Sequence, residues 1–328
     1  MSVGTVRPAM VPVTRHMRAY FAPVDRSTEQ PVTFDPGKSG LFNLATPPAP
    51  WIDLGWIDNF QRTSGTTTDS IHAGTRGAAT SQFRGPLDAR LQFDFGEWGK
   101  LQIALACGSE HMNVLATDPS GSARPSGGTP IAAVAVLPGS TSTEIVVGAG
   151  SVDSFSVADL IAVDADYQQQ TGYVGTGISA ACVRDSADVN HDPDYVRRVT
   201  FNIGRVVEKT ATSLLLAQPL LGRDPLSGAG IQKVVAFVDR EGGSFFQEWS
   251  ALFVAEEDSG GRICFYYPRL SPQQTTQFSR EGSVEVTTPV STMALHASFL
   301  ALASIDMNDA ATVVCYRSYF PAAMAPVY

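Results

Sequence analysis

Residues Ala89-Arg-Leu-Gln-Phe-Asp-Phe95 alternate strictly between apolar and polar side chains. The apolar positions are Ala89, Leu91, Phe93 and Phe95, and the polar positions are Arg90, Gln92 and Asp94. Successive side chains of a strand point to opposite faces of a sheet. This period of two therefore predicts a strand with one face in a core and the other face in contact with water or another subunit.

A helix is expected directly after this strand. Trp98, Leu101 and Leu105 recur at helical spacing between Glu97 and Ala106, and Gly108 is a helix stop signal. This is the only segment whose sequence convincingly predicts a helix.

The sequence before the strand divides into three parts. Residues 1–50 contain repeated prolines, which remove ladder donors and block helices, so they predict an extended arm with short strands that a partner orders. Residues 51–57 (Trp-Ile-Asp-Leu-Gly-Trp-Ile) predict a short apolar strand. Residues 61–82 are rich in Thr, Ser and Gly and predict a long hairpin or loop, a kind of segment that is often functional.

The sequence after the helix changes character at residues 117–130, whose Gly, Pro and Ser content is typical of a flexible connection. Beyond it, short strand patterns with turn signals predict a small barrel or sandwich over residues 119–289. The expected strands are Glu144–Val147, Leu160–Val163, Val199–Val207, Ser213–Ala217, Gln232–Val238, Ser250–Val254 and Arg262–Tyr267. Two long strands are expected at Met293–Leu302 and Ala311–Tyr319.

The composition is that of a folded protein of about two domains. The chain has 328 residues, of which 44% are hydrophobic and 17% are charged, and this excludes extended disorder. The formal net charge of −9 argues against a basic surface that grips a phosphate backbone. Four widely separated cysteines form no C-x-x-C pair and are expected to be reduced and buried, and neither a secretory leader nor a membrane span is expected.

The sequence contains no strong catalytic motif, and we expect neither an enzyme nor a bound cofactor. The five histidines do not pair at metal-ligand spacing, and no serine lies in a G-x-S-x-G elbow. One acidic stretch is a weak candidate for a hard cation such as calcium, through Asp188, Asn190, Asp192 and Asp194. Proline and valine stand where a calcium loop needs glycine and glutamate, so a solvated acidic turn is the alternative.

Taken in order, these features resemble the major tail tube proteins of tailed bacteriophages. The resemblance lies in Trp51–Ile57, Gly74–Phe83, Leu91–Trp98 and Leu101–Leu105, and it covers residues 1–118 and 290–328. It implies a mainly β fold, a β-sandwich or β-barrel with one flanking α-helix and an N-terminal arm. Residues 119–289 would then be an inserted small β-barrel domain that decorates or braces the assembly.

The resemblance also implies a non-enzymatic structural subunit of the virion. Six copies would form a ring by joining their sheets, and stacked rings would form a helical tube that conducts DNA during ejection. The expected partners are further copies of the chain, other tail proteins, and DNA that passes through without specific binding. Assembly would take place in the cytoplasm of a bacterial host.

Two groups of residues would serve this assembly. Contacts between rings are expected at Trp51, Trp56, Thr66, Thr68, His72 and Arg76. Arg90, Gln92 and Asp94, on the polar face of the alternating strand, are expected to face the lumen. Edge strands become joining surfaces when a heterologous contact closes into a ring.

Other functions stay open at the level of the sequence. A subunit of the tail tip, baseplate or neck ring is the nearest alternative to the tube protein. A carbohydrate- or receptor-binding β module would need exposed aromatic side chains clustered in one pocket. A β-rich hydrolase would need a pocket that joins a histidine, a carboxylate and a serine or cysteine.

Overall fold

The computed structural model shows a mainly β protein with one α-helix among the residues that it describes. The described residues are 14–24, 28–37, 42–48, 50–73, 78–97, 99–108, 110–120, 131–164, 181–182, 202–220, 224–240, 248–257, 261–273, 278–282 and 291–321. In these ranges no helix is long and apolar enough to cross a membrane.

Six antiparallel strands close into a β-barrel. They are β1 (Thr14–Pro23), β2 (Ile52–Ala73), β3 (Ala78–Phe95), β12 (Trp249–Glu257), β13 (Arg262–Pro272) and β15 (Ser291–Leu302). The order around the barrel is β15-β3-β2-β1-β12-β13, and pairing of β13 with β15 closes it. Two short strands, β14 (Phe278–Gly282) and β18 (Tyr316–Phe320), extend the sheet beside β15 and β13.

The barrel draws two strands from the region expected to be the inserted domain. β12 and β13 lie within residues 119–289, yet β12 pairs with β1 along nearly its whole length and β13 pairs with β15. Both strands carry the same short sequence pattern as the strands before them, which predicts that they belong to the insertion. The partner that places β12 in the barrel is β1, at the other end of the chain, so no local signal separates these strands from the insertion.

The inner surface of the barrel is apolar and aromatic. Phe21, Phe93, Phe253 and Phe299 are fully buried and contact one another, with ring centroids of Phe93 and Phe299 5.4 Å apart. The expected helix is confirmed as α1 (Lys100–Cys107), which adds Leu101, Leu105 and Ala106 to this core. It ends at Gly108, whose φ of 58° lies in the left-handed region that favours glycine.

Part of the outer surface of the barrel is covered by the protein's own N-terminal segment. We call the described residues between Thr28 and Pro48 the strap. Its Val32, Phe34, Phe42 and Leu44 pack on the outward side chains of β1, β12 and β13. The sequence predicts that residues 1–50 are extended and ordered by a partner. Instead, β1 is a strand of the barrel, and the strap packs on the barrel of its own chain. Aromatic and aliphatic side chains spaced between the prolines make this contact.

A second sheet of eight strands follows the helix. Its strands are β4 (Glu110–Leu115), β5 (Val134–Ala135), β6 (Glu144–Val146), β7 (Leu160–Asp164), β8 (Ala181–Cys182), β9 (Ile203–Lys209), β10 (Ser213–Leu216) and β11 (Gly230–Arg240). The order is β6-β10-β9-β7-β11-β4-β8, with β5 on β11, and pairings between these strands leave the sheet open. It has its own apolar core, which includes Phe155, Ile161 and Leu214, and a short 3-10 helix, η2 (Val152–Ser154).

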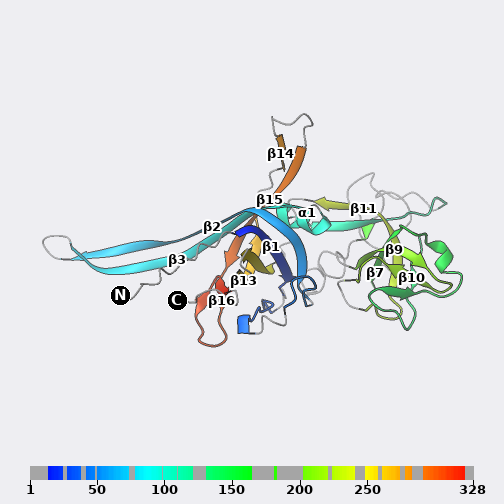
Figure 1. The fold of residues 1–328 in the computed structure, drawn as a ribbon, viewed down its shortest axis with the longest axis horizontal. Coiled ribbons are helices and arrows are strands. Elements are labelled where there is room, and N and C mark those ends of the chain that lie inside the picture. The colour runs from blue at the N-terminus through cyan, green and yellow to red at the C-terminus, as the bar shows by residue number, and fades with distance from the viewer. Residues whose placement is uncertain are drawn as a thin grey trace, which may run out of the picture.

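The barrel carries two projecting hairpins. The long one is formed by β2 and β3, and in Figure 1 it extends from one side of the barrel while the second sheet lies on the opposite side. β1 pairs with β2 only as far as Ile57, and β15 pairs with β3 only between Arg90 and Phe95. We call Thr66–Ala73 and Ala78–Leu87 the arm; among the described strands they pair only with each other. The short hairpin is β16 (Ser304–Ile305) with β17 (Thr312–Val313).

Candidate assembly surfaces

The outer face of β2, β3 and β15 is a polar wall. Arg90 and Gln92 are exposed and Asp94 is partly exposed, while the residues between them on β3 are buried. The alternation in the sequence therefore predicts the orientation of this strand correctly. Gln61 and Thr63 of β2 stand opposite Gln92 and Arg90, and both are exposed. The wall carries charged and amide groups and offers a wetted surface.

Asp94 is the centre of a side-chain network on this wall. Its Oδ2 accepts a hydrogen bond from Nδ2 of Asn59 at 2.7 Å, and its Oδ1 lies 2.8 Å from Nδ1 of His296. Asn59 has a φ of 54° at a β-bulge between Asp58 and Gln61. A bulge bends a strand and increases its twist. The network thus braces β2 at the bulge just beyond Ile57, where its pairing with β1 ends, and His296 has a structural, hydrogen-bonded role in it.

The arm exposes much of its surface. The Thr66 side chain is exposed, and Ile71 and Leu87 are 50% and 45% exposed. Thr68 and His72 lie in β2, but their side chains are outside the described part of the structure, as is the whole of Arg76. A two-stranded hairpin is marginally stable alone in water. The hairpin that the Thr- and Ser-rich stretch predicts is therefore present, and it exposes apolar as well as polar side chains.

The two tryptophans expected at subunit contacts lie in different environments. Trp51 is only 5% exposed and packs in the aromatic cluster under the strap, 5.8 Å from Phe42 and 6.3 Å from Tyr266 between ring centroids. Its surface is used within the protomer, which leaves little for a subunit contact. Trp56 is 40% exposed, and the guanidinium carbon of Arg18 lies 5.3 Å from its ring centroid. Only Trp56 of this pair is presented to solvent.

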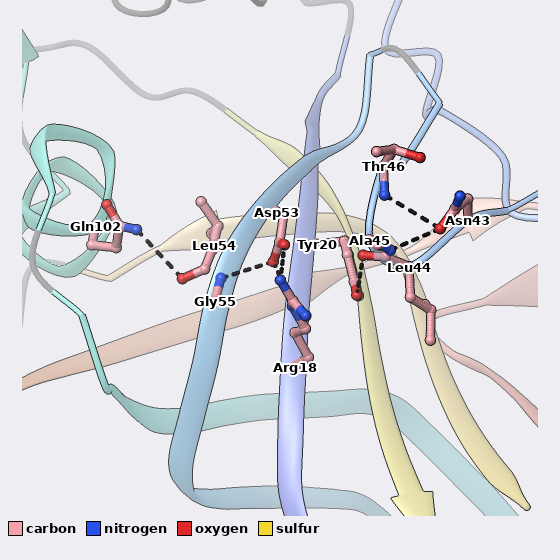
Figure 2. Close-up of polar contacts among 10 residues, drawn as sticks. All are labelled: Arg18, Tyr20, Asn43, Leu44, Ala45, Thr46, Asp53, Leu54, Gly55 and Gln102. Atoms are coloured by element: carbon pink, nitrogen blue, oxygen red, sulfur yellow. Dashed lines mark hydrogen bonds and ion pairs between the residues drawn. The ribbon is translucent and has the colours of Figure 1, made fainter. Parts of the chain in front are cut away.

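Arg18 is held in place by the network drawn in Figure 2. Its Nε donates to Oδ1 of Asp53 at 3.0 Å, and its Nη2 pairs with the other carboxylate oxygen. The Gly55 amide donates to the same Oδ1 at 2.9 Å. The hydrogen bond to Asp53 raises the pKa of Arg18 further above its ordinary value. Arg18 is therefore held on one side by a carboxylate and lies on the other side over the ring of Trp56.

The same region joins the strap and the helix to the barrel. The Tyr20 hydroxyl donates to the Leu44 carbonyl of the strap at 2.9 Å, and Nε2 of Gln102 in α1 donates to the Leu54 carbonyl at 3.4 Å. The Tyr266 hydroxyl donates in the same way to the Val32 carbonyl at 2.9 Å. No sequence signal identifies these contacts, because each joins a side chain to a backbone group of a distant segment.

The remaining sequence candidates are the acidic stretch and the cysteines. The cation candidates Asp188, Asn190, Asp192 and Asp194 lie outside the described residues. Within the part of the chain that the structure describes, no group of three or more His, Cys, Asp or Glu is arranged to hold a metal ion. Cys107 and Cys264 are buried free thiols, as expected, and burial raises the pKa of Cys264 to about 12. That thiol therefore stays protonated at neutral pH and is a poor nucleophile.

No protein-family model matches the chain, and no curated protein matches it either.

Proposed function

We propose that the protein is a structural subunit that assembles through its arm into stacked rings, as the subunits of a phage tail tube do. The arm is the observation that carries the proposal. Its strand Thr66–Ala73 is roughly 25 Å long, at about 3.3 Å per residue, and lies beyond the part of β2 that pairs with β1 and beyond the part of β3 that pairs with β15. A ribbon of this length with exposed Ile71 and Leu87 is stabilised when a further surface covers it.

The polar wall gives the proposed ring an inner surface. Arg90, Gln92 and Asp94 lie on the barrel wall away from the strap, so they are the side chains proposed to line a lumen. A net charge of −9 suits a conduit for DNA, because a phosphate backbone slides past such a subunit without being held. Six copies per ring, other tail proteins as partners and a place in the virion are parts of the same proposal.

Electron microscopy of the purified protein, with mass photometry across concentrations, tests the proposal. The wild-type protein is expected to form rings or hollow tubes. A stable monomer at every concentration would argue for a binding module instead.

A shortened variant tests the arm itself. Gly65 and Asp88 are a cross-strand pair, so Thr66–Leu87 can be replaced by Asn-Gly, the preferred two-residue hairpin turn. This variant is expected to fold as a monomer that forms no tubes, because the barrel pairings of β2 and β3 remain. The matched control replaces Asp306–Ala311 with the same turn between Ile305 and Thr312, which shortens the other hairpin. The control is expected to assemble; tubes from the arm variant, or failure of both, would remove the arm from its proposed role.

A further inference from the structure

The arm has an open edge on each side. Its two strands pair with each other, and no other described strand pairs with their outer edges. An open edge presents a row of backbone N–H and C=O groups that a further strand can join. The arm also extends away from the barrel that carries it (Figure 1). A barrel strand that joins the arm therefore belongs to another molecule.

A second open edge lies on the barrel itself. β18 is the last strand of the barrel sheet, and among the described strands it pairs only with β13. One face of β18 is anchored, because Tyr316 and Phe320 pack on the cluster under the strap. On the other face Arg317 is exposed and Tyr319 is 39% exposed. β18 is therefore a firmly held strand whose outer side is accessible.

The side chains of the two edges follow the same order. Asp69 and Ile71 lie two residues apart in one strand of the arm, so they share one face of the hairpin. Asp69 is exposed, and Ile71 is 50% exposed. Arg317 and Tyr319 share one face of β18 in the same way. Each edge thus presents a charged side chain followed by an apolar one, and the two charges have opposite sign.

Neither charge has an ion-pair partner within the described part of its own chain. The charged residues nearby are paired: Asp88 lies 3.6 Å from Arg90 at the base of the arm, and Arg262 of β13 lies 3.8 Å from Glu256. Opposite charges on neighbouring strands stabilise their pairing, whereas like charges destabilise it. Asp69 and Arg317 are therefore complementary charges on two separate surfaces.

We propose that the arm of one copy adds to the edge of β18 in a second copy, as a further strand of the barrel sheet. The strand Thr66–Ala73 runs parallel to β18, and Asp69 lies beside Arg317. In the same register Ile71 lies beside Tyr319, whereas an antiparallel strand would set each charge beside an apolar side chain. Main-chain hydrogen bonds supply the affinity of such strand addition, and the side chains select its register. The inference rests on the proposed assembly through the arm and names the surface that receives it.

Disulfide trapping between introduced cysteines tests this register. The full chain carrying Asp69→Cys and Arg317→Cys is oxidised and run on a non-reducing gel, where linked copies form a ladder of multimers. Neighbouring strands lie about 4.8 Å apart, which suits the Cα separation of a disulfide. The double variant is expected to give the ladder. The wild-type chain, which keeps its four cysteines, sets the background.

Two further cysteine pairs are the matched controls. Ser70→Cys with Arg317→Cys is expected to give no ladder, because Ser70 points to the opposite face of the hairpin. Asp69→Cys with Tyr319→Cys is the pair that an antiparallel strand would bring together, and it is expected to give none either. A ladder from either control that equals the ladder of the Asp69 and Arg317 pair would overturn the register.

Charge reversal gives a second test. Asp69→Arg and Arg317→Asp each set like charges side by side, and each is expected to raise about tenfold the protein concentration at which copies associate in mass photometry. The double variant restores opposite charges and is expected to associate as the wild type does. Arg262→Asp is the matched control, since Arg262 is exposed on the opposite face of the same sheet. It is expected to keep wild-type association.

The outcomes separate the strand addition from the proposed tube. Tubes without the ladder, or single charge variants that associate as the wild type does, would overturn the strand addition and leave the tube. Linked copies without rings or tubes would support the strand addition and overturn the tube. A wild-type protein that stays monomeric, together with a cysteine pair that gives no ladder, would overturn both.

Discussion

The docking of the strap on its own barrel can be tested by removing two oxygen atoms. The hydroxyls of Tyr20 and Tyr266 donate to the strap carbonyls of Leu44 and Val32, each at 2.9 Å. The double variant Tyr20→Phe/Tyr266→Phe deletes both hydrogen bonds and keeps both rings. Since the rings stay packed, the variant isolates the polar contacts that hold the strap.

The expected loss follows from these two bonds. A neutral hydrogen bond contributes a net free energy of about 1 kcal/mol to folding, and somewhat more where the abandoned carbonyl stays buried. The double variant is therefore expected to lower the free energy of unfolding by about 2 kcal/mol. Exchange of the strap amides should also become faster, because the strap opens before the barrel unfolds.

Urea denaturation and amide hydrogen exchange measure these effects. Tyr316→Phe is the matched control, since its hydroxyl donates to Oδ2 of Asp306 at 2.5 Å in the short hairpin and not to the strap. The control is expected to leave strap exchange unchanged. The reasoning fails if the double variant is as stable as the wild type, or if the control loosens the strap as much.

Three further predictions concern the barrel and its strands. Phe93→Ala is expected to lower the free energy of unfolding by about 4 kcal/mol in urea, because Phe93 is fully buried among three other phenylalanines. Gly55→Ala is expected to cost about 1–2 kcal/mol, since φ is +83° there and the added methyl meets the Glu97 carboxyl at 3.4 Å; Gly65→Ala, with nothing within 4 Å, should cost less. Burial raises the pKa of Tyr20 above 10.0, so the unfolded chain ionises first at alkaline pH. Stability is therefore full below pH 10 and falls above it by about 1.4 kcal/mol per pH unit for each buried tyrosine, and Tyr20→Phe flattens this slope in pH-dependent urea titrations.

Local patterns in the sequence predict individual elements well. The period of two at Ala89–Phe95, the helical spacing up to Ala106 and the polar stretch at 61–82 correspond to β3, α1 and the long hairpin. Each of these signals lies within a few residues of the element that it predicts. The mainly β class with one helix follows from them and is confirmed. The resemblance implied a sandwich or a barrel, and the structure has a closed barrel.

Long-range pairing limits what the sequence predicts. β1 meets β12 in a register that joins Phe21 to Ala251, and nothing in either segment identifies the other. The prolines of the first 50 residues indicate extended backbone but not the surface on which it lies. For this reason the sequence predicts that residues 1–50 are ordered by a partner, and it places β12 and β13 in the insertion.

The same limit applies to the candidate surfaces. Alternation is enough to turn Arg90 and Gln92 outward, but it does not distinguish buried Trp51 from exposed Trp56. Arg62 stands in a polar stretch whose pattern predicts exposure, yet its Nε is buried. Only the cross-strand partner Leu91 shows that this arginine points into the core.

The continuity of β2 has a mechanical consequence. One uninterrupted strand runs from its pairing with β1 into the tip of the arm. In an antiparallel ladder the hydrogen bonds are perpendicular to the strands. Tension applied at the tip therefore loads the bonds between β1 and β2 together, in shear, rather than peeling them one at a time. The arm is anchored as a tether whose strength is the combined strength of those bonds, in addition to being a surface for contact.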